Sequence, residues 1–421
     1  MMEGAGFTAG IVTSFARAIG GCGKYQVDGL GFSEPAGIPV NDRREEIYGR
    51  LLHFPPPPKP PEDLSQALRT ALALISPSHV PIPIADEHRG LRGYAQRRVF
   101  WQNFRSKLRE RIRGYDLYHW HCFLPDYLPV LDFLPSPANL IVTLWGSDVY
   151  RSHGVAEYTR QWKAARRASR VTMATPELAD LFLSKFGRDL ENKLRIISYG
   201  SDVVGLIDRF RGERDSFLRR IGVAPERITI LVGHNASPGN QQESMFRAIA
   251  KVPEHQRSLI ALLIPMTYTG STSPHERQIR ECAENCGVPF RVLDQRLSLD
   301  DVARLRIATD IMIHVPISDQ FSGAMCESLV AGAVLITGAW LPYRRLRESG
   351  VCFHEVLRVE DISAKLTDIL VRFEAERLRT RNNAEIVKGL VGWQSIVPQW
   401  TKAYDELLCP EIAPEPTEPG K

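Results

Sequence analysis

The stretch LWGSDVYRSHG, Leu144 to Gly154, follows the apolar run ANLIVT and replaces it with glycine, a carboxylate, aromatic and basic residues. A continuous run of Leu, Ile and Val is typical of a parallel strand that helices cover on both faces. In open α/β sheets, ligands bind at the carboxyl ends of such strands. The pattern therefore predicts a ligand-binding edge at Gly146, Ser147, Asp148 and Tyr150. The alternative is that Ser147 or Asp148 only caps the next helix.

The composition is that of a globular, cytoplasmic protein. A chain of 421 residues is long enough for about two or three domains. The formal net charge of +4 is too small to indicate a nucleic-acid partner, and the seven cysteines are odd in number and scattered, as expected for reduced thiols. No apolar run reaches the about 18 residues that a membrane span needs. The first residues lack the basic start and apolar core of a secretory signal.

Strand-like and helical segments alternate along the chain, which predicts parallel sheets built from βαβ units. The strand candidates are YQVDGLGF, YDLYHWH, ANLIVTLW, RVTMAT and LRIISYG in the first half, and ITILVG, SLIALLIPM, PFRVLD, DIMIHV and AVLITG in the second. A strand should also precede the Gly-rich loop and helix of residues 1–21. The sequence offers no candidate, so we expect either that the first strand is reduced or that the given sequence starts late.

These two halves predict an α/β protein of two Rossmann-like domains that face each other across a cleft, where small molecules usually bind. The predicted ranges are an N-terminal domain 1–205, a C-terminal domain 206–390, a helix 391–409 that crosses back to the N-terminal domain, and a tail 410–421. The tail is rich in proline and acidic residues, so we expect it to be disordered.

The second half carries a polar motif, ISDQFSGAMCESLVAGAVLITG, directly after a strand candidate. Ser322 and Gly323 open a helix, whose unpaired backbone N–H groups would attract an anion such as a diphosphate. Glu327 lies one turn further on, where it could accept hydrogen bonds from sugar or ribose hydroxyls. Replacing Glu327 should therefore weaken ligand binding far more than folding. The alternative is a purely structural helix, capped by Ser322 and ended by Gly332.

The two alternating halves, with YHWH, WGSD, YGSD and SDQFSGAMCESLVAGAVLITG, resemble a GT-B nucleotide-sugar glycosyltransferase. The last motif is similar to the carboxylate, seven residues, glutamate pattern of the retaining family 4 enzymes, with Asp319 and Glu327 at its ends. Two features differ from that family. Asp319 stands where glutamate is usual, and no Arg and Lys follow the strand that ends LVGHNASPGN. The sequence therefore leaves a retaining or an inverting outcome open.

A closer resemblance is to the TDP-N-acetylfucosamine:lipid II N-acetylfucosaminyltransferase family. It rests on WGSDVY, AARRASRVTMATPELADL, LVGHNASPGNQQ and IPMTYTGS, and it extends over roughly residues 115–350. The resemblance implies a lipid-diphosphate acceptor and no metal or other cofactor. It implies donor-binding residues in the second domain: Gly233, His234, Asn235, Met266, Tyr268, Gln320, Ser322, Gly323 and Glu327.

The resemblance places the acceptor in the first domain, beside Trp145, Gly146, Ser147, Tyr150 and Arg151. The implied catalytic residues are Asp148, His121 and Asp319, because an attacking hydroxyl needs a general base such as Asp or His. His121 ends a strand two positions after His119, so both rings point to one face. Either histidine could instead be a buried structural residue.

Residues 89–113 form a basic segment in which arginines alternate with Tyr94, Phe100, Trp101 and Phe104. This pattern fits an anionic membrane surface. Nucleic acid is a weaker alternative, because no nucleic-acid-binding motif accompanies the charge. A third interpretation is a solvated helix whose aromatic residues enter the core.

Together these patterns predict a hexosyltransferase that moves a sugar from a nucleotide-sugar to a glycan or lipid-linked acceptor, in surface polysaccharide or glycolipid assembly. It would work in the cytoplasm, either free or peripheral to the inner face of the membrane, without a nucleic-acid partner. The alternatives are a nucleotide-sugar epimerase of the same architecture and a non-catalytic scaffold that binds nucleotide-sugar.

Overall fold

The computed structural model describes residues 2–5, 9–32, 51–54, 114–125, 128–266 and 274–409. The basic segment 89–113, Tyr268 and the tail 410–421 lie outside these ranges. Within the described ranges, no helix is both long and apolar enough to cross a membrane.

The chain divides into two compact units. The first comprises Met1–Ala174, Leu178–Ile197 and Val397–Lys421, and the second comprises Thr175–Glu177 and Ser198–Ile396. The main change of unit comes after Ile197 rather than after residue 205, because the next helix packs with its apolar face in the core of the second unit. The return to the first unit comes inside the last helix, at Val397, within the range 391–409 predicted to cross back.

The described strands of the first unit form one parallel sheet in the order β3-β2-β1-β4-β5-β6-β7. They are β1 (Met2–Ala5), β2 (Asp28–Phe32), β3 (Leu51–Phe54), β4 (Tyr118–His121), β5 (Leu140–Thr143), β6 (Arg170–Met173) and β7 (Leu194–Ile196). Of the two alternatives for the start of the chain, the structure shows a reduced first strand of 4 residues. Met2–Ala5 pairs with β2 on one side and with β4 on the other. Its sequence, MEGA, has no β-branched or aromatic residue, so only the pairing reveals it.

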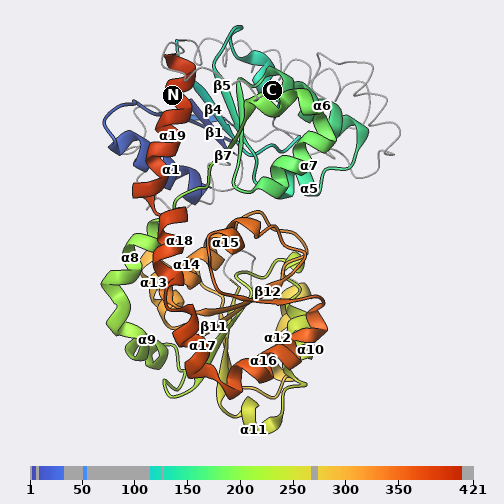
Figure 1. The fold of residues 1–421 in the computed structure, drawn as a ribbon, viewed down its shortest axis with the longest axis vertical. Helices are drawn as coiled ribbons and strands as arrows, with labels where there is room; N and C mark the ends of the chain where they lie inside the picture. The colour runs from blue at the N-terminus through green and yellow to red at the C-terminus, as the bar shows by residue number, and fades with distance from the viewer. Residues whose placement is uncertain are drawn as a thin grey trace, which may run out of the picture. The chain divides into compact units, whose positions relative to one another are not determined.

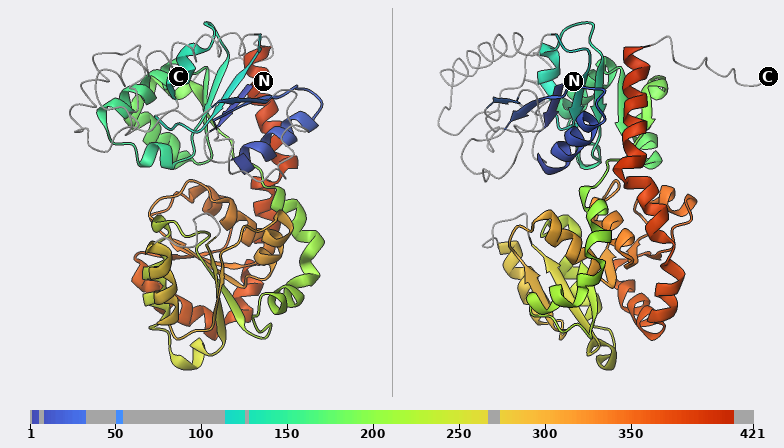
Figure 2. Two further views of the ribbon diagram at one scale, coloured as in Figure 1. Left: turned by 180° about the vertical axis from the view of Figure 1, so that it is seen from behind. Right: turned by 90° about the vertical axis from the view of Figure 1, so that its left-hand side faces the viewer.

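Helices cover this sheet, and the last helix of the chain is among them. Their ranges are α1 (Ala9–Gly21), α5 (Ser147–Tyr150), α6 (Val155–Arg167), α7 (Pro176–Phe186) and α19 (Trp393–Leu408). From Val397 onward, α19 lies beside α1 in the first unit (Figure 2). Its Trp400 ring is 5.0 Å from the Phe15 ring, centroid to centroid, and both side chains are fully buried. The N-terminal and C-terminal helices thus share one core.

The described strands of the second unit form a parallel sheet in the order β10-β9-β8-β11-β12-β13. They are β8 (Ile228–Val232), β9 (Ile260–Pro265), β10 (Phe290–Leu293), β11 (Ile311–His314), β12 (Val334–Gly338) and β13 (His354–Val356). The first five lie within the predicted strand candidates. β13 was not predicted, because HEV is short and polar.

Helices cover both faces of the second sheet. They are α8 (Asp202–Phe210), α9 (Arg214–Arg220), α10 (Gln242–Ile249), α11 (Glu254–Arg257), α12 (Pro274–Glu284), α13 (Leu299–Ile307), α14 (Gly323–Ala331), α15 (Arg344–Glu348), α16 (Ile362–Val371), α17 (Phe373–Thr380) and α18 (Asn383–Val391). Ile230 and Val232 of β8 share a core with α10, α12 and α16, whereas Leu231 packs with α8, α13 and α14 on the other face (Figure 1). Burial on both faces explains why β8, β9, β11 and β12 were recognisable as largely apolar runs.

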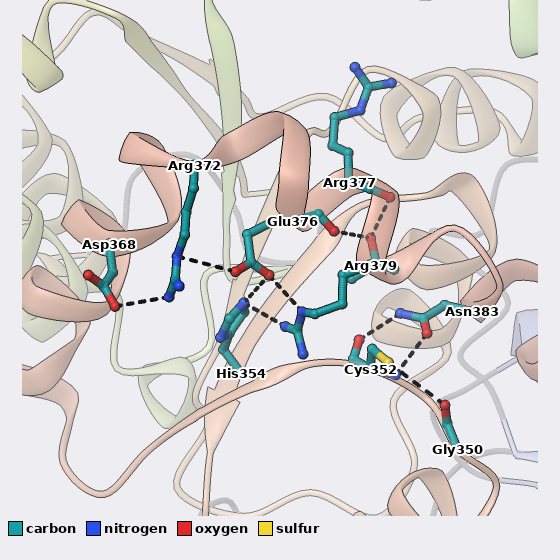
Figure 3. A network of polar contacts seen from close by, with 10 residues as sticks. Gly350, Cys352, His354, Asp368, Arg372, Glu376, Arg377, Arg379 and Asn383 are labelled. Carbon is teal, nitrogen blue, oxygen red and sulfur yellow. Dashed lines mark hydrogen bonds and ion pairs between the residues drawn. The ribbon is translucent and has the colours of Figure 1, made fainter.

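A polar network ties β13 to α17 (Figure 3). Glu376 accepts hydrogen bonds from His354 Nε2 at 2.9 Å and Arg379 Nε at 2.8 Å, and its other oxygen pairs with Arg372 Nε at 3.6 Å. Burial alone would raise the pKa of Glu376, but the hydrogen bonds from Arg379 and His354 hold it below its ordinary value. His354 is the first residue of β13, so the network lies at the amino end of this edge strand rather than at the carboxyl ends of the strands, where ligands bind. We therefore assign it a structural role.

Candidate functional site

Each sheet has one point where the strand order reverses: between β1 and β4 in the first unit, and between β8 and β11 in the second. In doubly wound sheets, ligands bind beside this switch point, at the carboxyl ends of the strands. The predicted donor residues 233–235 follow β8, and the motif 319–327 follows β11. The second sheet therefore brings two separate sequence motifs to the same edge.

The loop after β8 is shaped by its own side chains. Gly233 has a φ of 70°, a left-handed conformation that glycine adopts without strain. Asn235 Oδ1 accepts hydrogen bonds from the Ser237 N–H at 2.9 Å and from Asn240 Nδ2 at 2.5 Å. These contacts fix the predicted Gly233–Asn235 segment as a compact turn at the end of the strand.

Asp319 lies in the loop after β11, where three groups contact one of its oxygens. Oδ2 accepts hydrogen bonds from the Tyr343 hydroxyl at 2.5 Å and the Ser322 N–H at 3.0 Å, and His314 Nε2 is 3.4 Å away. Burial would raise the pKa of Asp319, but the hydrogen bonds from His314 and Tyr343 hold it below its ordinary value. Asp319 is therefore a fixed carboxylate at the edge of the sheet.

Helix α14 begins as the sequence predicted. Ser322 caps it, since its Oγ accepts a hydrogen bond from the Met325 N–H at 3.4 Å, and Gly332 ends it with a φ of 98°. Glu327 is largely buried and contacts Ser201 and Arg306. The capping interpretation and the ligand interpretation are thus compatible, because the cap uses the side chain of Ser322 and leaves Glu327 on a separate turn.

Several buried polar atoms near β8 and β11 have no hydrogen-bond partner within the described residues. They are His234 Nδ1, His314 Nδ1, Gln242 Oε1 and Gln320 Nε2. The His234 and His314 rings are 5.4 Å apart, centroid to centroid. Burial, together with the neighbouring His314 and Arg306, lowers the pKa of His234 to about 3, so its imidazole is neutral at pH 7. Unpaired buried polar groups are rare and costly in folded proteins, so this cluster is a candidate site for a polar ligand.

Of the two predicted residues after β9, the structure describes only one. Met266 is buried and donates its backbone N–H to the Leu293 carbonyl at 2.7 Å. Its side chain belongs to the core on the α10 face of the sheet. The predicted contact of Tyr268 with a nucleotide base lies outside the described residues.

In the first unit, Asp148 is buried and its carboxylate contacts the backbone. Its Oδ2 accepts hydrogen bonds from the Phe123 N–H at 2.6 Å and the Trp145 N–H at 2.9 Å. Burial raises the pKa of Asp148, although these backbone N–H groups oppose the shift. The carboxylate connects the ends of β4 and β5, which favours an anchoring role. The predicted role as general base stays a prediction.

The two histidines of β4 are buried as well. His119 Nδ1 is 2.8 Å from the Tyr404 hydroxyl, and His119 Nε2 is 2.6 Å from Thr143 Oγ1. The His121 ring lies on His119, with centroids 3.9 Å apart. The two rings share a face, as an ideal strand requires. His119 is thus a structural residue, and the catalytic role of His121 is still a prediction.

The remaining predicted acceptor-side residues surround α5. Gly146 precedes this helix with a φ of 89°, Ser147 and Arg151 are exposed, and Trp145 and Tyr150 are partly exposed. This turn therefore presents polar and aromatic groups outside the buried Asp148.

Sequence reasoning missed five residues at the second edge: Ser201, Gln242, Arg306, His314 and Tyr343. Ser201 stands in the YGSD motif, and His314 ends a strand as His121 does, so both had a signal in the sequence. Nothing in the sequence around Arg306 distinguishes it from its neighbours. Within the described residues, no group of three or more His, Cys, Asp or Glu side chains could hold a metal ion.

No protein-family model and no curated protein matches the chain. Solved structures do match. HepE from Anabaena, in complex with UDP and glucose, has a TM-score of 0.71 and 14% identity, covering 96% of this chain and 99% of HepE. Sucrose-phosphate synthase from Thermosynechococcus elongatus has a TM-score of 0.68 and 14% identity, covering 97% and 95%. WaaG, a glycosyltransferase involved in lipopolysaccharide biosynthesis, has a TM-score of 0.62 and 14% identity, covering 97% and 99%.

The chain has the GT-B fold. The fold class predicted from the sequence is confirmed, and the structural neighbours are glycosyltransferases. An identity of 14% supports the fold alone. The finer resemblance to the TDP-N-acetylfucosamine transferases is not confirmed and stays a prediction.

Proposed function

We propose that the chain transfers a hexose from a nucleotide-sugar donor to a glycan or lipid-linked acceptor, in the assembly of a surface polysaccharide or glycolipid. The observation that carries this proposal is the cluster of unpaired buried polar atoms at the β8 and β11 edge, beside Asp319 and Glu327. HepE supports it, because that protein shares the fold and has been solved with UDP and with UDP-glucose.

The nucleotide-sugar donor would lie along the carboxyl ends of β8 and β11, where its diphosphate, ribose, sugar and base would each contact different residues. Backbone can approach a phosphate closely at Gly233, and the N-terminus of α14 offers N–H groups to the diphosphate. Glu327 would hold the ribose. His314, Gln320 and Asp319 would hold sugar hydroxyls, since together they present donors and acceptors. Tyr268 would border the base, as the sequence predicts, whereas the side chain of Met266 belongs to the core.

The acceptor would contact Trp145, Ser147, Tyr150 and Arg151, which are at least partly exposed around α5. Charge that develops on the departing diphosphate would be stabilised by the N–H groups of α14, because preorganised donors lower such a barrier. We expect no metal requirement. Donor turnover should therefore be the same in excess chelator as in added Mg²⁺, and a loss of turnover in chelator would refute this part of the proposal.

Incubating the purified protein with a panel of nucleotide sugars, with and without a cell extract containing acceptor, tests the activity. Nucleotide release that requires the acceptor supports transfer. Conversion of the sugar without release would instead make the protein an epimerase. Binding without either reaction would make it a scaffold.

Residues 89–113 would attach the protein to an anionic membrane surface. Changing Arg97, Arg98, Arg105 and Arg109 to Glu should release it from vesicles of anionic lipid while donor binding is unchanged. Each basic group near such a surface contributes about 1 kcal/mol, so four reversals should abolish binding. Equal vesicle binding by the wild type and the variant would refute the membrane role and favour the alternative that this segment is a solvated helix.

A further inference from the structure

Two side chains from separate helices hold the carboxylate of Glu327. Ser201 Oγ donates a hydrogen bond to Oε1 at 2.8 Å, and Arg306 Nε donates one to Oε2 at 3.0 Å. Arg306 lies in the last turn of α13, and its side chain is 8% exposed, against 11% for Glu327. Neither Ser201 nor Arg306 belongs to the motif 319–327, and neither has a role in the proposed donor contacts.

Ser201 is itself held in place. Its hydroxyl oxygen caps α8 by accepting the Val203 N–H at 3.2 Å, which directs the hydroxyl proton to Glu327. Three helices, α8, α13 and α14, therefore determine where the carboxylate lies. A carboxylate fixed at both oxygens loses little conformational entropy when a ligand binds.

This arrangement leaves a defined binding capacity. An ionised carboxylate offers about four lone-pair sites. Within the described residues, the hydrogen bonds from Ser201 and Arg306 use one site on each oxygen of Glu327, so one is left on each. Two adjacent acceptor oxygens with one open site each match two neighbouring hydroxyl groups.

We propose that Ser201 and Arg306 are positioning residues that hold Glu327 for the 2′- and 3′-hydroxyls of a ribose together. The site would therefore select ribonucleotides over 2′-deoxyribonucleotides. This inference rests on the proposed function, which places a nucleotide-sugar at this edge. It distinguishes this chain from the resemblance to TDP-sugar enzymes, because the deoxyribose of dTDP has only the 3′-hydroxyl.

The burial of the Arg306–Glu327 pair supports a functional role. A buried ion pair usually contributes no more to stability than apolar side chains of the same volume would, because both charges lose their hydration. A helix interface between α13 and α14 could be packed with apolar groups alone, as its neighbours Leu305 and Leu329 are. The presence of Arg306 at that interface is therefore better explained by its orienting the Glu327 carboxylate than by a contribution to stability.

Calorimetry on the unmodified protein is the first test, and it measures the dissociation constants of UDP and 2′-deoxy-UDP. ADP and GDP are then compared with their own 2′-deoxy forms, and dTDP is compared with UDP. A lost hydrogen bond to a charged group should weaken binding of the deoxy form by about 10- to 100-fold. Equal affinity for a ribonucleotide and its deoxy form, or dTDP binding as tightly as UDP, would overturn the inference and leave the proposed function standing. If no nucleotide binds, the proposed function fails as well.

Variants separate positioning from stability. The quantity to follow is the dissociation constant of the 2′-deoxyribonucleotide divided by that of the ribonucleotide. Ser201→Ala should bring this ratio toward one, and Ser201→Thr, which retains the hydroxyl, should restore it. The matched control is Ser298→Ala, which removes the cap of α13, where Ser298 Oγ accepts the Asp301 N–H at 3.1 Å, without touching Glu327. Both Ala variants should lose similar stability in thermal unfolding. An unchanged ratio in Ser201→Ala would refute a positioning role for Ser201.

Arg306→Lys keeps the charge, so it should fold, but it removes the fixed Nε donor. The ratio should fall by about 10-fold, as for loss of a charged hydrogen bond. The control on the same helix is Arg304→Lys, because Arg304 pairs with Glu213 and Asp301 away from Glu327. A ratio that is the same in both variants and in the unmodified protein would refute a positioning role for Arg306.

Discussion

The two sheets have the same strand order around their switch points, but their polar groups there are used differently. In the first unit, both ring nitrogens of His119 have partners, Tyr404 and Thr143, and Asp148 binds backbone N–H groups. In the second unit, His314 occupies a comparable strand end on β11, yet its Nδ1 has no partner within the described residues. Groups of the chain itself pair with the first set of polar atoms, whereas we propose that a ligand pairs with the second.

This difference separates structural from functional polar residues better than residue type does. Both edges contain histidine and a carboxylate, and sequence patterns alone rank them alike. A buried polar group with all its hydrogen bonds made stabilises the fold, while one without a partner carries a cost that a bound ligand can remove. The comparison yields four predictions, which run from the largest expected effect to the smallest.

The largest effect is expected for Glu327→Ala. Donor affinity should fall at least about 100-fold, from the loss of two charged hydrogen bonds. The sequence alone predicted little effect on folding. The pairing with buried Arg306 changes that expectation, because removing one partner of a buried pair costs about 3–5 kcal/mol. Calorimetry with UDP and denaturant unfolding check both quantities. Full stability with lost binding would mean that Arg306 finds water or another partner.

A matched pair of variants tests the comparison directly. His119→Phe should lose about 1–3 kcal/mol of unfolding free energy, because it removes the two buried hydrogen bonds that the His119 ring makes with the Tyr404 and Thr143 hydroxyls. His314→Phe removes a ring that has one unpaired nitrogen and one long contact to Asp319, so its stability should change by no more than about 1 kcal/mol.

Donor binding should show the opposite order. We expect weaker UDP-glucose binding in His314→Phe and unchanged binding in His119→Phe, measured on the same preparations. If His119→Phe impairs donor binding and His314→Phe does not, the two edges have been assigned the wrong way round.

Asp148→Asn distinguishes an anchor from a general base. As an anchor, Asp148 accepts backbone N–H groups at both oxygens, and an amide offers only one acceptor, so unfolding should cost about 1–3 kcal/mol less. Turnover per folded molecule would then be unchanged. A general base would instead lose roughly 100- to 10,000-fold in turnover. Turnover and melting temperature from one preparation decide between these roles, and a large loss of turnover at full stability would contradict the anchor.

The sequence predicted the fold well because buried parallel strands are continuous apolar runs, as in Ile228–Val232 and Val334–Gly338. It failed at Met2–Ala5 and His354–Val356, whose strands exist through pairing with neighbours rather than through their own propensity. For the site, the helix cap at Ser322 was predictable because it depends on residues close in sequence.

Long-range partners were not predictable. The contact between Arg306 and Glu327 joins α13 and α14, which are separated in the sequence by the strand β11. No local sequence pattern specifies which side chain of α13 contacts Glu327. The same reason explains why the anchoring contacts of Asp148 were not predicted: its position at a strand end was visible in the sequence, but its hydrogen bond from the Phe123 N–H was not.

The smallest effect concerns pH, and it distinguishes the open edge from a solvated one. His234 has a folded pKa of about 3, below the unfolded value of about 6.5, because burial disfavours its charged form. Between these values the unfolded chain binds more protons than the folded one, so the unfolding free energy should decrease as pH falls from about 6.5 toward 3. His234→Asn removes this contribution, while His119, whose pKa burial also lowers, contributes equally in both proteins. Denaturant unfolding at pH 7.5 and about 6.0 should therefore show a loss that is up to about 1 kcal/mol larger for the unmodified protein than for His234→Asn. An equal loss would mean that the His234 ring is hydrated, and that its unpaired nitrogen is satisfied by water rather than reserved for a ligand.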